Sequence, residues 1–265
     1  MRQDETTRFR PSRRWGQNFL RNPAAVERIV ETLAPRGGDF VLEIGPGDGA
    51  LTARLVQLPI DLLAIEIDPR LVDRLSRRFA TPAFRIIEAD ATEAPLPDQP
   101  FLAVGNLPYN VATPILRRVV ASLMCRRAVF MVQKEVAGRL TARPGDDEYG
   151  FLSLVVALDA RPRVVMTLGP GSFRPRPRVD SAIVLLEIER YQAITPRDSL
   201  VELISAAFGK RRKKLSNAVS GFRGVTRPIV EEVMVRVGLD PGIRAERLSL
   251  EDFDRLGSAL LSVVP

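Results

Sequence analysis

The chain has 265 residues, of which 45% are hydrophobic and 27% are charged, and its formal net charge is +7. This composition is typical of a globular protein with a sizeable core and excludes general disorder. The sequence has no histidine and a single cysteine, Cys125. These counts exclude a Ser-His-Asp triad and an intramolecular disulfide, and no metal site is predicted.

The basic balance favours a polyanionic partner, with nucleic acid ahead of a membrane surface. No apolar stretch approaches the roughly 20 residues needed to cross a bilayer, and the N-terminus lacks the apolar core of a secretory signal. We therefore expect a cytoplasmic protein without a membrane partner. The arginine-rich residues 1–14 show little apolar periodicity and are interpreted as a basic, flexible arm.

Apolar spacing from residue 23 onward predicts helices and strands in alternation. In chain order we expect a helix at 23–34, a strand at 40–44, a helix from about 50, a strand at 62–67, a helix from about 69, strands at 84–88 and 101–104, a helix from about 113 and a strand at 128–132. Wholly apolar strands that alternate with helices indicate parallel strands buried on both faces. The apolar runs 152–158 and 182–188 are expected to be further strands, and their direction, parallel or antiparallel, stays open.

Beyond residue 196 only helical patterns remain, at 200–208, 213–219, 228–237 and 250–263. The expected fold class is therefore α/β, with a Rossmann-like sheet that has helices on both faces and a small all-helical C-terminal domain. The expected bounds are 15–190 for the first domain and 191–265 for the second.

A glycine-rich turn follows the strand at 40–44 and includes Gly45 and Gly47. Glycines let the backbone approach a ligand, and the helix N-terminus behind them offers free N–H groups. Glu66 ends the next strand, where a carboxylate accepts hydrogen bonds from ribose hydroxyls, and Asp90 follows the third strand within reach of an adenine edge. The alternative is a tight turn with ordinary surface acids.

The glycines lack the G-x-G-x-x-G spacing of a dinucleotide site, and no G-K-[ST] phosphate loop is present. An adenosine cofactor without a pyrophosphate fits this pattern better. We therefore predict S-adenosyl-L-methionine as the cofactor.

The segment Asn106-Leu107-Pro108-Tyr109 follows the fourth strand. The lone pair of an adenine N6 is delocalised into the ring and is a poor nucleophile. A side-chain amide oxygen and a backbone carbonyl each accept one N6 hydrogen, which aims the lone pair at a methyl donor. The tyrosine ring stacks on an extruded base. The alternative is a proline-containing turn with a packed tyrosine.

The sequence resembles the ribosomal RNA adenine N6,N6-dimethyltransferases, the KsgA family. The matching stretches are Gly16-Gln17-Asn18-Phe19-Leu20, Glu43-Ile44-Gly45-Pro46-Gly47, Gly105-Asn106-Leu107-Pro108-Tyr109-Asn110, Gln133-Lys134-Glu135-Val136, Tyr149-Gly150, residues 173–181 and residues 208–213. The resemblance implies a methyltransferase sheet that binds the cofactor at Asn18, Leu20, Gly45, Glu66, Asp90 and Asn106. It also implies that Phe173 stacks on the target base opposite Tyr109. Its implied substrate is a pair of neighbouring adenines in the 3′-terminal hairpin loop of small-subunit (16S) rRNA, modified within a pre-ribosomal particle during subunit biogenesis.

Five consecutive basic residues, Lys210, Arg211, Arg212, Lys213 and Lys214, begin a helical segment. Like charges in such a run repel one another and wrap around any helix, so a phosphate partner is favoured over a solvated helix face. We expect this run to bind RNA. The arginines of residues 1–14 are a further candidate for RNA binding, and this alternative stays open.

Three other functions stay open. A large-subunit rRNA adenine methyltransferase of the antibiotic-resistance type shares the Asn-x-Pro-Tyr logic. A DNA adenine methyltransferase is less well supported, because no target-recognition insertion is visible. The chain could instead act chiefly as an assembly checkpoint that binds immature subunits. We expect it to be a monomer.

Overall fold

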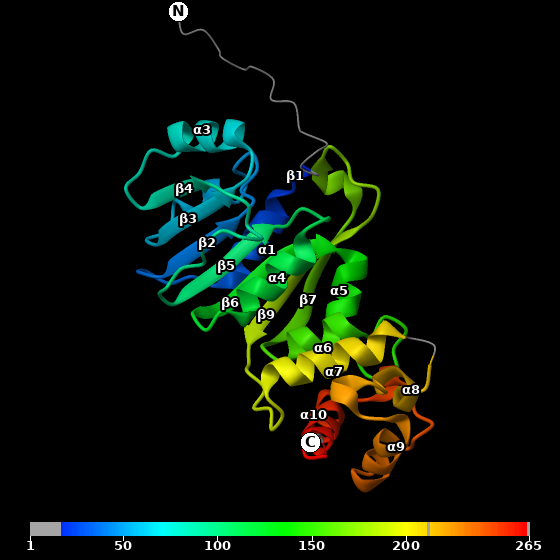
Figure 1. Ribbon diagram of the computed structural model, residues 1–265. Coiled ribbons are helices and arrows are strands. Elements are labelled where there is room, and N and C mark those ends of the chain that lie inside the picture. Colours follow the sequence, from blue (N-terminus) through cyan, green and yellow to red (C-terminus); the bar gives the residue numbers. More distant parts are fainter. Residues whose placement is uncertain (1–16, 211–212, 264–265) are drawn as a thin grey trace, which may run out of the picture. The chain divides into compact units, whose positions relative to one another are not determined.

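The computed structural model describes residues 17–210 and 213–263 (Figure 1). The chain forms two compact units. One comprises the chain up to Ala137 together with Arg163–Glu187, and the other comprises Gly138–Pro162 and the chain from Ile188 onward. The expected boundary after residue 190 lies close to the last point at which the chain passes from one unit to the other, after Glu187. The expected division differs in placing 138–162 in the first domain, whereas the contacts group this stretch with the C-terminal helices.

The first unit is built on a seven-stranded sheet with the order β4-β3-β2-β5-β6-β9-β7. The bounds are β2 Phe40–Ile44, β3 Asp61–Glu66, β4 Phe84–Glu88, β5 Phe101–Asn106, β6 Cys125–Gln133, β7 Ala160–Leu168 and β9 Ser181–Ile188. Neighbouring strands from β4 to β6 are parallel, and β9 is antiparallel to β6. The expected alternation and the expected strand at 182–188 are therefore confirmed.

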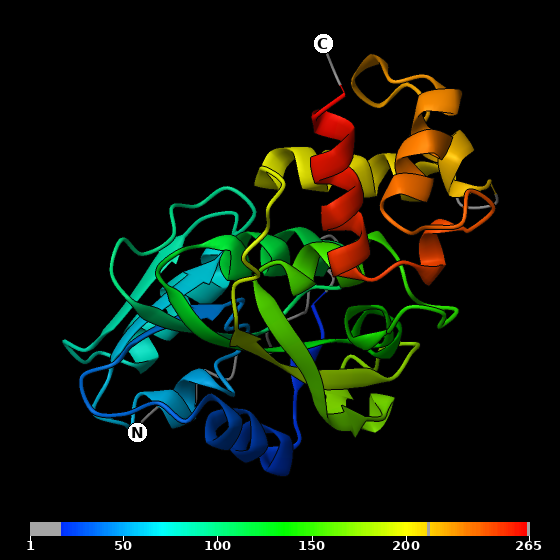
Figure 2. The same ribbon diagram turned by 90° about the horizontal axis from the view of Figure 1, so that it is seen from below.

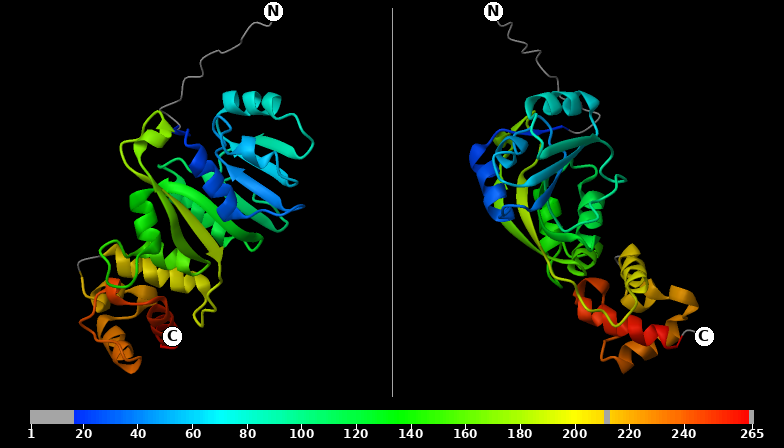
Figure 3. Two further views of the ribbon diagram at one scale, coloured as in Figure 1. Left: turned by 180° about the vertical axis from the view of Figure 1, so that it is seen from behind. Right: turned by 90° about the vertical axis from the view of Figure 1, so that its left-hand side faces the viewer.

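Helices cover both faces of this sheet. They are α1 Pro23–Leu33, α2 Thr52–Leu55, α3 Pro69–Arg78 and α4 Ala112–Ala121, and α5 Lys134–Thr141 spans the boundary between the two units. Figure 1 shows α4 in front of the sheet, and the reverse view in Figure 3 shows α1 on the opposite face. Proline occupies the first turn of α1 and α3, and the side chains of Asn22 and Asp68 cap their N-termini. These signals fix where each helix begins.

The register of the parallel strands brings four strand ends together. Ile44 of β2 lies opposite Ile65 of β3 and Gly105 of β5, and Glu66 lies opposite Glu88 of β4. Because parallel strands share one direction, the loops after them leave from the same edge of the sheet, where α/β proteins bind ligands.

A separate two-stranded ribbon pairs β1, Phe19–Leu20, with β8, Phe173–Arg174, in antiparallel register. The 3-10 turn η1, Pro170–Ser172, leads into β8. The side chains of Leu20 and Phe173 belong to the core that also contains the buried face of α1. The ribbon therefore joins residues about 150 positions apart in the sequence.

The strand predicted at 152–158 is wrong, because residues Phe151–Ala157 form helix α6. Leu152 to Val156 are buried without a break. A helix that is buried on every side has the same continuous apolar run as a strand, so periodicity does not separate the two. Leu154, Val155 and Leu158 belong to the core of the C-terminal unit.

Strand β7 was not predicted. Its sequence contains Pro162 between Arg161 and Arg163, a pattern that argues against a central strand. Since β7 is the last strand of the sheet, its outer edge needs no hydrogen-bond donors, and proline is tolerated there.

The C-terminal unit is helical, with α7 Arg197–Gly209, α8 Leu215–Val219, α9 Arg227–Arg236 and α10 Leu250–Leu261, and with the 3-10 turns η2 Phe222–Gly224 and η3 Ala245–Arg247. Figure 2 shows α10 beside α7 and α9. Ser249 and Asp252 cap α10 reciprocally. All four expected helices are present, although the second begins at Leu215 instead of residue 213. No helix in the described part of the chain is long and apolar enough to cross a membrane.

Candidate cofactor and substrate site

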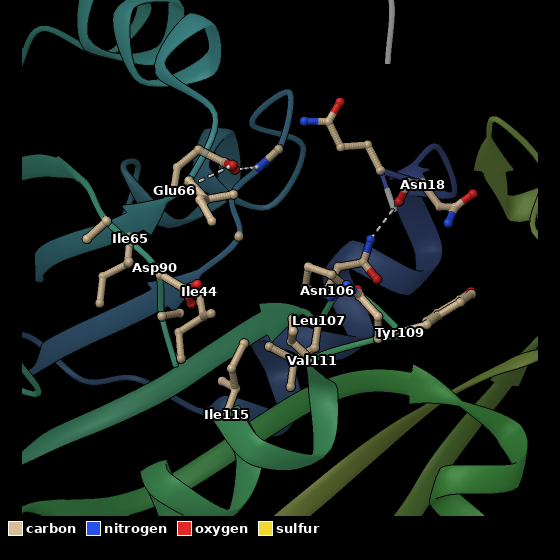
Figure 4. Close-up of a pocket in the computed structure, with 18 of the residues that line it drawn as sticks. Asn18, Ile44, Ile65, Glu66, Asp90, Asn106, Leu107, Tyr109, Val111 and Ile115 are labelled. Carbon is tan, nitrogen blue, oxygen red and sulfur yellow. Dashed lines mark hydrogen bonds between the residues drawn. The ribbon is translucent and has the colours of Figure 1, made fainter. Parts of the chain in front are cut away.

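A cavity of about 300 Å³ lies in the first unit, where β2, β3, β4 and β5 end (Figure 4). Figure 4 shows Glu66 and Asp90 on one side and Asn106 and Tyr109 on the other. The lining residues are Gln17, Asn18, Phe19, Ile44, Gly45, Gly47, Ile65, Glu66, Ile67, Ala89, Asp90, Ala91, Asn106, Leu107, Pro108, Tyr109, Asn110, Val111 and Ile115. The predicted cofactor and substrate segments therefore share one cavity.

The glycine turn forms one wall through its backbone. Gly45 and Gly47 have φ angles of 65° and 59°, a left-handed conformation that favours glycine. A Cβ on Gly47 would lie 2.9 Å from Cδ1 of Phe19. The turn thus allows both Phe19 and a ligand to approach the backbone closely.

Glu66 is held in place by three backbone donors. Its Oε2 accepts a hydrogen bond from Gly47 N at 3.1 Å, and its Oε1 accepts from Ile67 N and Asp68 N at 3.0 Å each. The side chain is 6% exposed. Burial raises the pKa of Glu66, and the three N–H donors oppose that rise. Oε2 has capacity for a further donor, which suits a ribose hydroxyl.

Replacing Glu66 with alanine is expected to weaken S-adenosylmethionine binding by about 1–3 kcal/mol, the scale for losing a charged hydrogen-bond acceptor. Isothermal calorimetry measures this change directly. The matched control is Glu88→Ala, because Glu88 ends the neighbouring strand opposite Glu66 but does not line the cavity. Equal affinities for both variants and the unaltered protein would remove Glu66 from the cofactor site.

Asp90 is exposed at the cavity, and one of its two carboxylate oxygens already accepts hydrogen bonds. Its Oδ1 accepts hydrogen bonds from the Thr92 amide at 2.8 Å and the Thr92 hydroxyl at 2.6 Å, and these bonds lower the pKa of Asp90. The other oxygen is available to an amino group such as that of a cofactor adenine. Apolar side chains of Ile65, Ile67 and Ile115 line the same cavity and suit a flat ring.

The amide of Asn106 has a fixed orientation. Its Nδ2 donates to the backbone carbonyl of Asn18 at 2.8 Å, as the dashed line in Figure 4 marks. Oδ1 is therefore left without a partner among the described residues. Leu107 N donates to Met131 O, and Pro108 O accepts from Val111 N, both at 3.1 Å. Within the described chain no N–H donates to the Leu107 carbonyl, so two oxygens that can accept hydrogen bonds lie on adjacent residues.

The tyrosine of this segment is half-buried. The Tyr109 hydroxyl and Ser181 Oγ are 2.8 Å apart and share a hydrogen bond, which anchors the ring from its outer end. The ring itself lines the cavity.

Two residues expected at the site have buried side chains. Phe173 is 1% exposed and packs in the core, so in this structure it offers no open ring face to a base. Leu20 is 5% exposed, also packs in the core and is absent from the cavity lining. Both lie in the β1–β8 ribbon, whose pairing turns these side chains inward. The position of Leu20 leaves only its backbone for a ligand.

Sequence reasoning missed the apolar lining of the cavity. Ile44 is the last residue of β2 and Ile65 the last but one of β3, and Ile67, Ala89, Ala91 and Ile115 lie in the segments after strand ends or in α4. The apolar residues just before and after the expected acids could have predicted this lining, because the residues that flank each strand end lie at the same edge of the sheet.

The predicted basic run lies in the C-terminal unit. Lys210, Lys213 and Lys214 are exposed, and Arg211 and Arg212 lie outside the described residues. The two described lysines at 213 and 214 precede α8. The expected arm, residues 1–14, also lies outside the described residues.

A buried acid, Glu43, supports the glycine turn from within β2. It is 1% exposed, and its Oε2 accepts a hydrogen bond from the Thr52 hydroxyl at 2.8 Å. Burial raises the pKa of Glu43 from its ordinary 4.5 to about 8. At neutral pH the group is therefore mostly protonated.

This pKa predicts how stability changes with pH. Because the folded protein binds the proton more tightly than the unfolded chain, Glu43 makes folding less favourable as the pH rises from about 4.5 to about 8. The limit for one proton is about 1.4 kcal/mol per pH unit. Urea unfolding at pH 5 to 8 is expected to show a flatter profile for Glu43→Gln, which keeps an acceptor for Thr52. Identical slopes for the two proteins would mean that Glu43 ionises normally.

The strand order defines the class of protein. A parallel sheet with one antiparallel strand, β9, inserted between β6 and the edge strand β7 is the Rossmann-like methyltransferase sheet. Proteins of this class take the methyl group from S-adenosyl-L-methionine, and the cavity combines a glycine turn, two acids and apolar side chains.

Comparisons with known proteins narrow the class to a family. Residues 8–256 match the ribosomal RNA adenine dimethylase family. The chain is 43% identical over 260 residues to "Ribosomal RNA small subunit methyltransferase A" of Methylococcus capsulatus, covering 94% of this chain and 98% of that protein. It is 42% identical to the protein of the same name from a Synechococcus strain, covering 96% of this chain and 95% of that protein. This chain belongs to the ribosomal RNA adenine dimethylase family.

Solved structures agree with that assignment. A dimethyladenosine transferase from Plasmodium falciparum has a TM-score of 0.81 at 26% identity, and the match covers 90% of this chain and 95% of that one. The 23S rRNA methyltransferase ErmE has a TM-score of 0.72 at 27% identity, with 92% and 99% covered. Both the expected fold class and the expected family are confirmed.

Proposed function

We propose that this enzyme transfers two methyl groups to the N6 nitrogen of each of two adjacent adenines in the 3′-terminal hairpin loop of small-subunit rRNA. The observation that carries the proposal is the pair of unpartnered acceptors, Asn106 Oδ1 and the Leu107 carbonyl, in the same cavity as the cofactor acids. Family membership and the names of the relatives support the substrate.

The reaction needs an N6 lone pair that points at the methyl donor. When bound, S-adenosyl-L-methionine supplies a methyl group on a sulfonium. Asn106 Oδ1 and the Leu107 carbonyl each accept one N6 hydrogen and turn the nitrogen toward tetrahedral geometry. Pro108 serves better as a rigid spacer than as the second acceptor, because its carbonyl already accepts a bond from Val111 N.

The same geometry constrains the second transfer. After one methylation only one N6 hydrogen remains, so one acceptor holds it while the new methyl group occupies the place of the other hydrogen. Asn106 and Leu107 orient the nitrogen and take no proton, so the N6 proton that each transfer releases passes to water, which suits a chain without histidine. Val111 and Ile115 add apolar surface to the cavity that receives the methyl groups.

Tyr109 is proposed to stack on the extruded base. Tyr109→Ala is expected to lower kcat/KM, because it removes a stacking interaction with the base that is worth about 1–3 kcal/mol. Tyr109→Phe keeps the ring and loses only the bond to Ser181, so its loss is expected to stay near 1 kcal/mol. Steady-state methyl transfer to unmethylated small subunits compares the two. Equal impairment of both variants would place the role of Tyr109 in its hydroxyl.

The choice of the small subunit over the large subunit rests on the relatives at 43% and 42% identity, since the similarity to ErmE is lower at 27%. Primer extension on both rRNAs after incubation with the protein and cofactor tests it. We expect stops only at two neighbouring adenines of the small-subunit rRNA. Stops in the large-subunit rRNA alone would overturn the assignment.

This function implies a partner, an oligomeric state and a cellular location. The substrate is proposed to be rRNA within a pre-ribosomal particle, met by the protein as a monomer in the cytoplasm. The exposed Lys210, Lys213 and Lys214 are proposed to contact RNA phosphates, together with Arg211 and Arg212.

A further inference from the structure

A second hollow lies beside the cavity and is lined mainly by arginines. It is a groove of about 790 Å³ in the first unit, and we call it the arginine groove. Its lining residues are Phe19, Arg21, Asp48, Ala50, Arg74, Arg78, Gly171, Phe173, Arg174, Pro175 and Arg176. Helix α3 supplies Arg74 and Arg78, β8 supplies Arg174, and Arg176 lies two residues after β8. Neither set is part of the cofactor and substrate cavity.

The groove carries a strong positive charge. Five arginines and one aspartate line it, which gives a formal charge of +4 from those groups. Arg74, Arg174 and Arg176 are exposed and form no ion pair with any described residue. Like charges that share a groove repel one another. A bound anion relieves this repulsion, so the unpaired arginines favour an anionic ligand.

The single acid of the groove is already neutralised. Asp48 is 9% exposed and forms an ion pair with Arg21 at 2.5 Å. Arg78 donates to the Asp48 backbone carbonyl at 3.1 Å. These contacts occupy Asp48, whereas Arg74, Arg174 and Arg176 are exposed.

The arginine groove adjoins the reaction site. Phe19 lines both the groove and the cavity, and the carbonyl of the preceding residue, Asn18, accepts the bond from Asn106. An extended chain whose base occupies the cavity therefore has the groove available for its neighbouring phosphates. The two large apolar side chains of the groove, Phe19 and Phe173, are 6% and 1% exposed, so the groove offers a lipid little apolar surface.

We propose that the arginine groove binds the phosphodiester backbone of the RNA strand next to the target adenine. Guanidinium groups match phosphate oxygens in a planar, two-bond geometry. Backbone contacts position a strand without reading its sequence, whereas the base is recognised in the cavity. This inference rests on the proposed function and assigns the groove a part in substrate binding that is separate from the cofactor site.

The test compares two triple variants with the same change in net charge. Arg74→Gln/Arg174→Gln/Arg176→Gln removes the three unpaired groove arginines. The matched control, Arg36→Gln/Arg161→Gln/Arg163→Gln, removes three exposed arginines that lie outside the groove. Binding to small ribosomal subunits with unmethylated rRNA is measured over a series of monovalent salt concentrations at constant magnesium, and cofactor affinity is measured by calorimetry.

For the groove variant we expect cofactor affinity within twofold of normal and weaker binding to the subunits. The slope of log affinity against log salt is expected to shrink by about 2, since each lost contact with a single strand contributes about 0.7. A lysine version of the same triple is expected to recover most of the slope, because charge is kept. The control variant is expected to keep the original slope.

The groove assignment would be overturned if the groove variant kept the original slope while the unaltered protein still methylates the subunits. It would also be overturned if both triple variants lost the same amount of slope, because general charge would then explain binding. A failure of the proposed function looks different: the unaltered protein would transfer no methyl group to the subunits at any salt concentration.

Discussion

Asn106→Ala is expected to lower the rate of both methyl transfers by about 10²–10³-fold, the scale for losing one preorganised hydrogen-bonding group at a reacting centre. The amide is held by Asn18 through its nitrogen, so its oxygen has one orientation before the base arrives. Without that oxygen the N6 lone pair stays delocalised into the ring π system and is a poor nucleophile. Because no proton-transfer base is used, orientation supplies most of the catalysis.

The control for this variant is Asn110→Ala, which removes a second asparagine amide from the lining of the same cavity. We expect Asn110→Ala to stay within a few-fold of the unaltered rate. Cofactor affinity is measured for both, since Asn106 also contacts the segment that contains Asn18. Near-normal dimethylation by Asn106→Ala, with the cofactor still bound, would mean that another group aims the nitrogen.

Gly105→Ala is expected to destabilise the fold by about 3 kcal/mol, at the upper end of the usual cost of overpacking. Gly105 lies in β5 opposite Ile44 of β2, and a Cβ there would lie 2.3 Å from the Ile44 carbonyl oxygen. The neighbour is backbone of a central strand and cannot turn aside. The methyl group would separate β5 from β2 and displace Asn106, the next residue.

Chemical denaturation followed by circular dichroism measures this loss. Gly169→Ala is the matched control, because nothing lies within 4 Å of the position its Cβ would take. We expect that control to stay within about 0.5 kcal/mol of the unaltered protein. A Gly105→Ala protein as stable as Gly169→Ala would show that β2 and β5 can separate without cost.

Much of the first unit follows from sequence pattern alone. Five strands, β2 to β6, each have a short apolar run, and Pro69 with Asp68 marks a helix start. The two failures have separate physical causes. Residues 152–156 are buried without a break, so a helix and a strand have the same pattern there, and β7 tolerates Pro162 because it lies at the edge.

The candidate site was predictable where it depends on strand ends. Gly45, Glu66, Asp90 and Asn106 were expected at one edge, and the parallel register brings them to one cavity. The burial of Phe173 was not predictable, because it depends on pairing with Leu20 far away in the sequence. The arginine groove was missed for the same reason, since α3 and the β8 segment come together only in the folded chain.

The central claim is that this chain makes N6,N6-dimethyladenosine in rRNA. Mass spectrometry of nucleosides from unmethylated small subunits, incubated with the protein and methyl-labelled S-adenosyl-L-methionine, tests it most directly. The expected result is two labelled dimethyladenosines per subunit, with monomethyladenosine only as an early intermediate. Label confined to any other nucleoside, or monomethyladenosine as the final product, would contradict the proposed function.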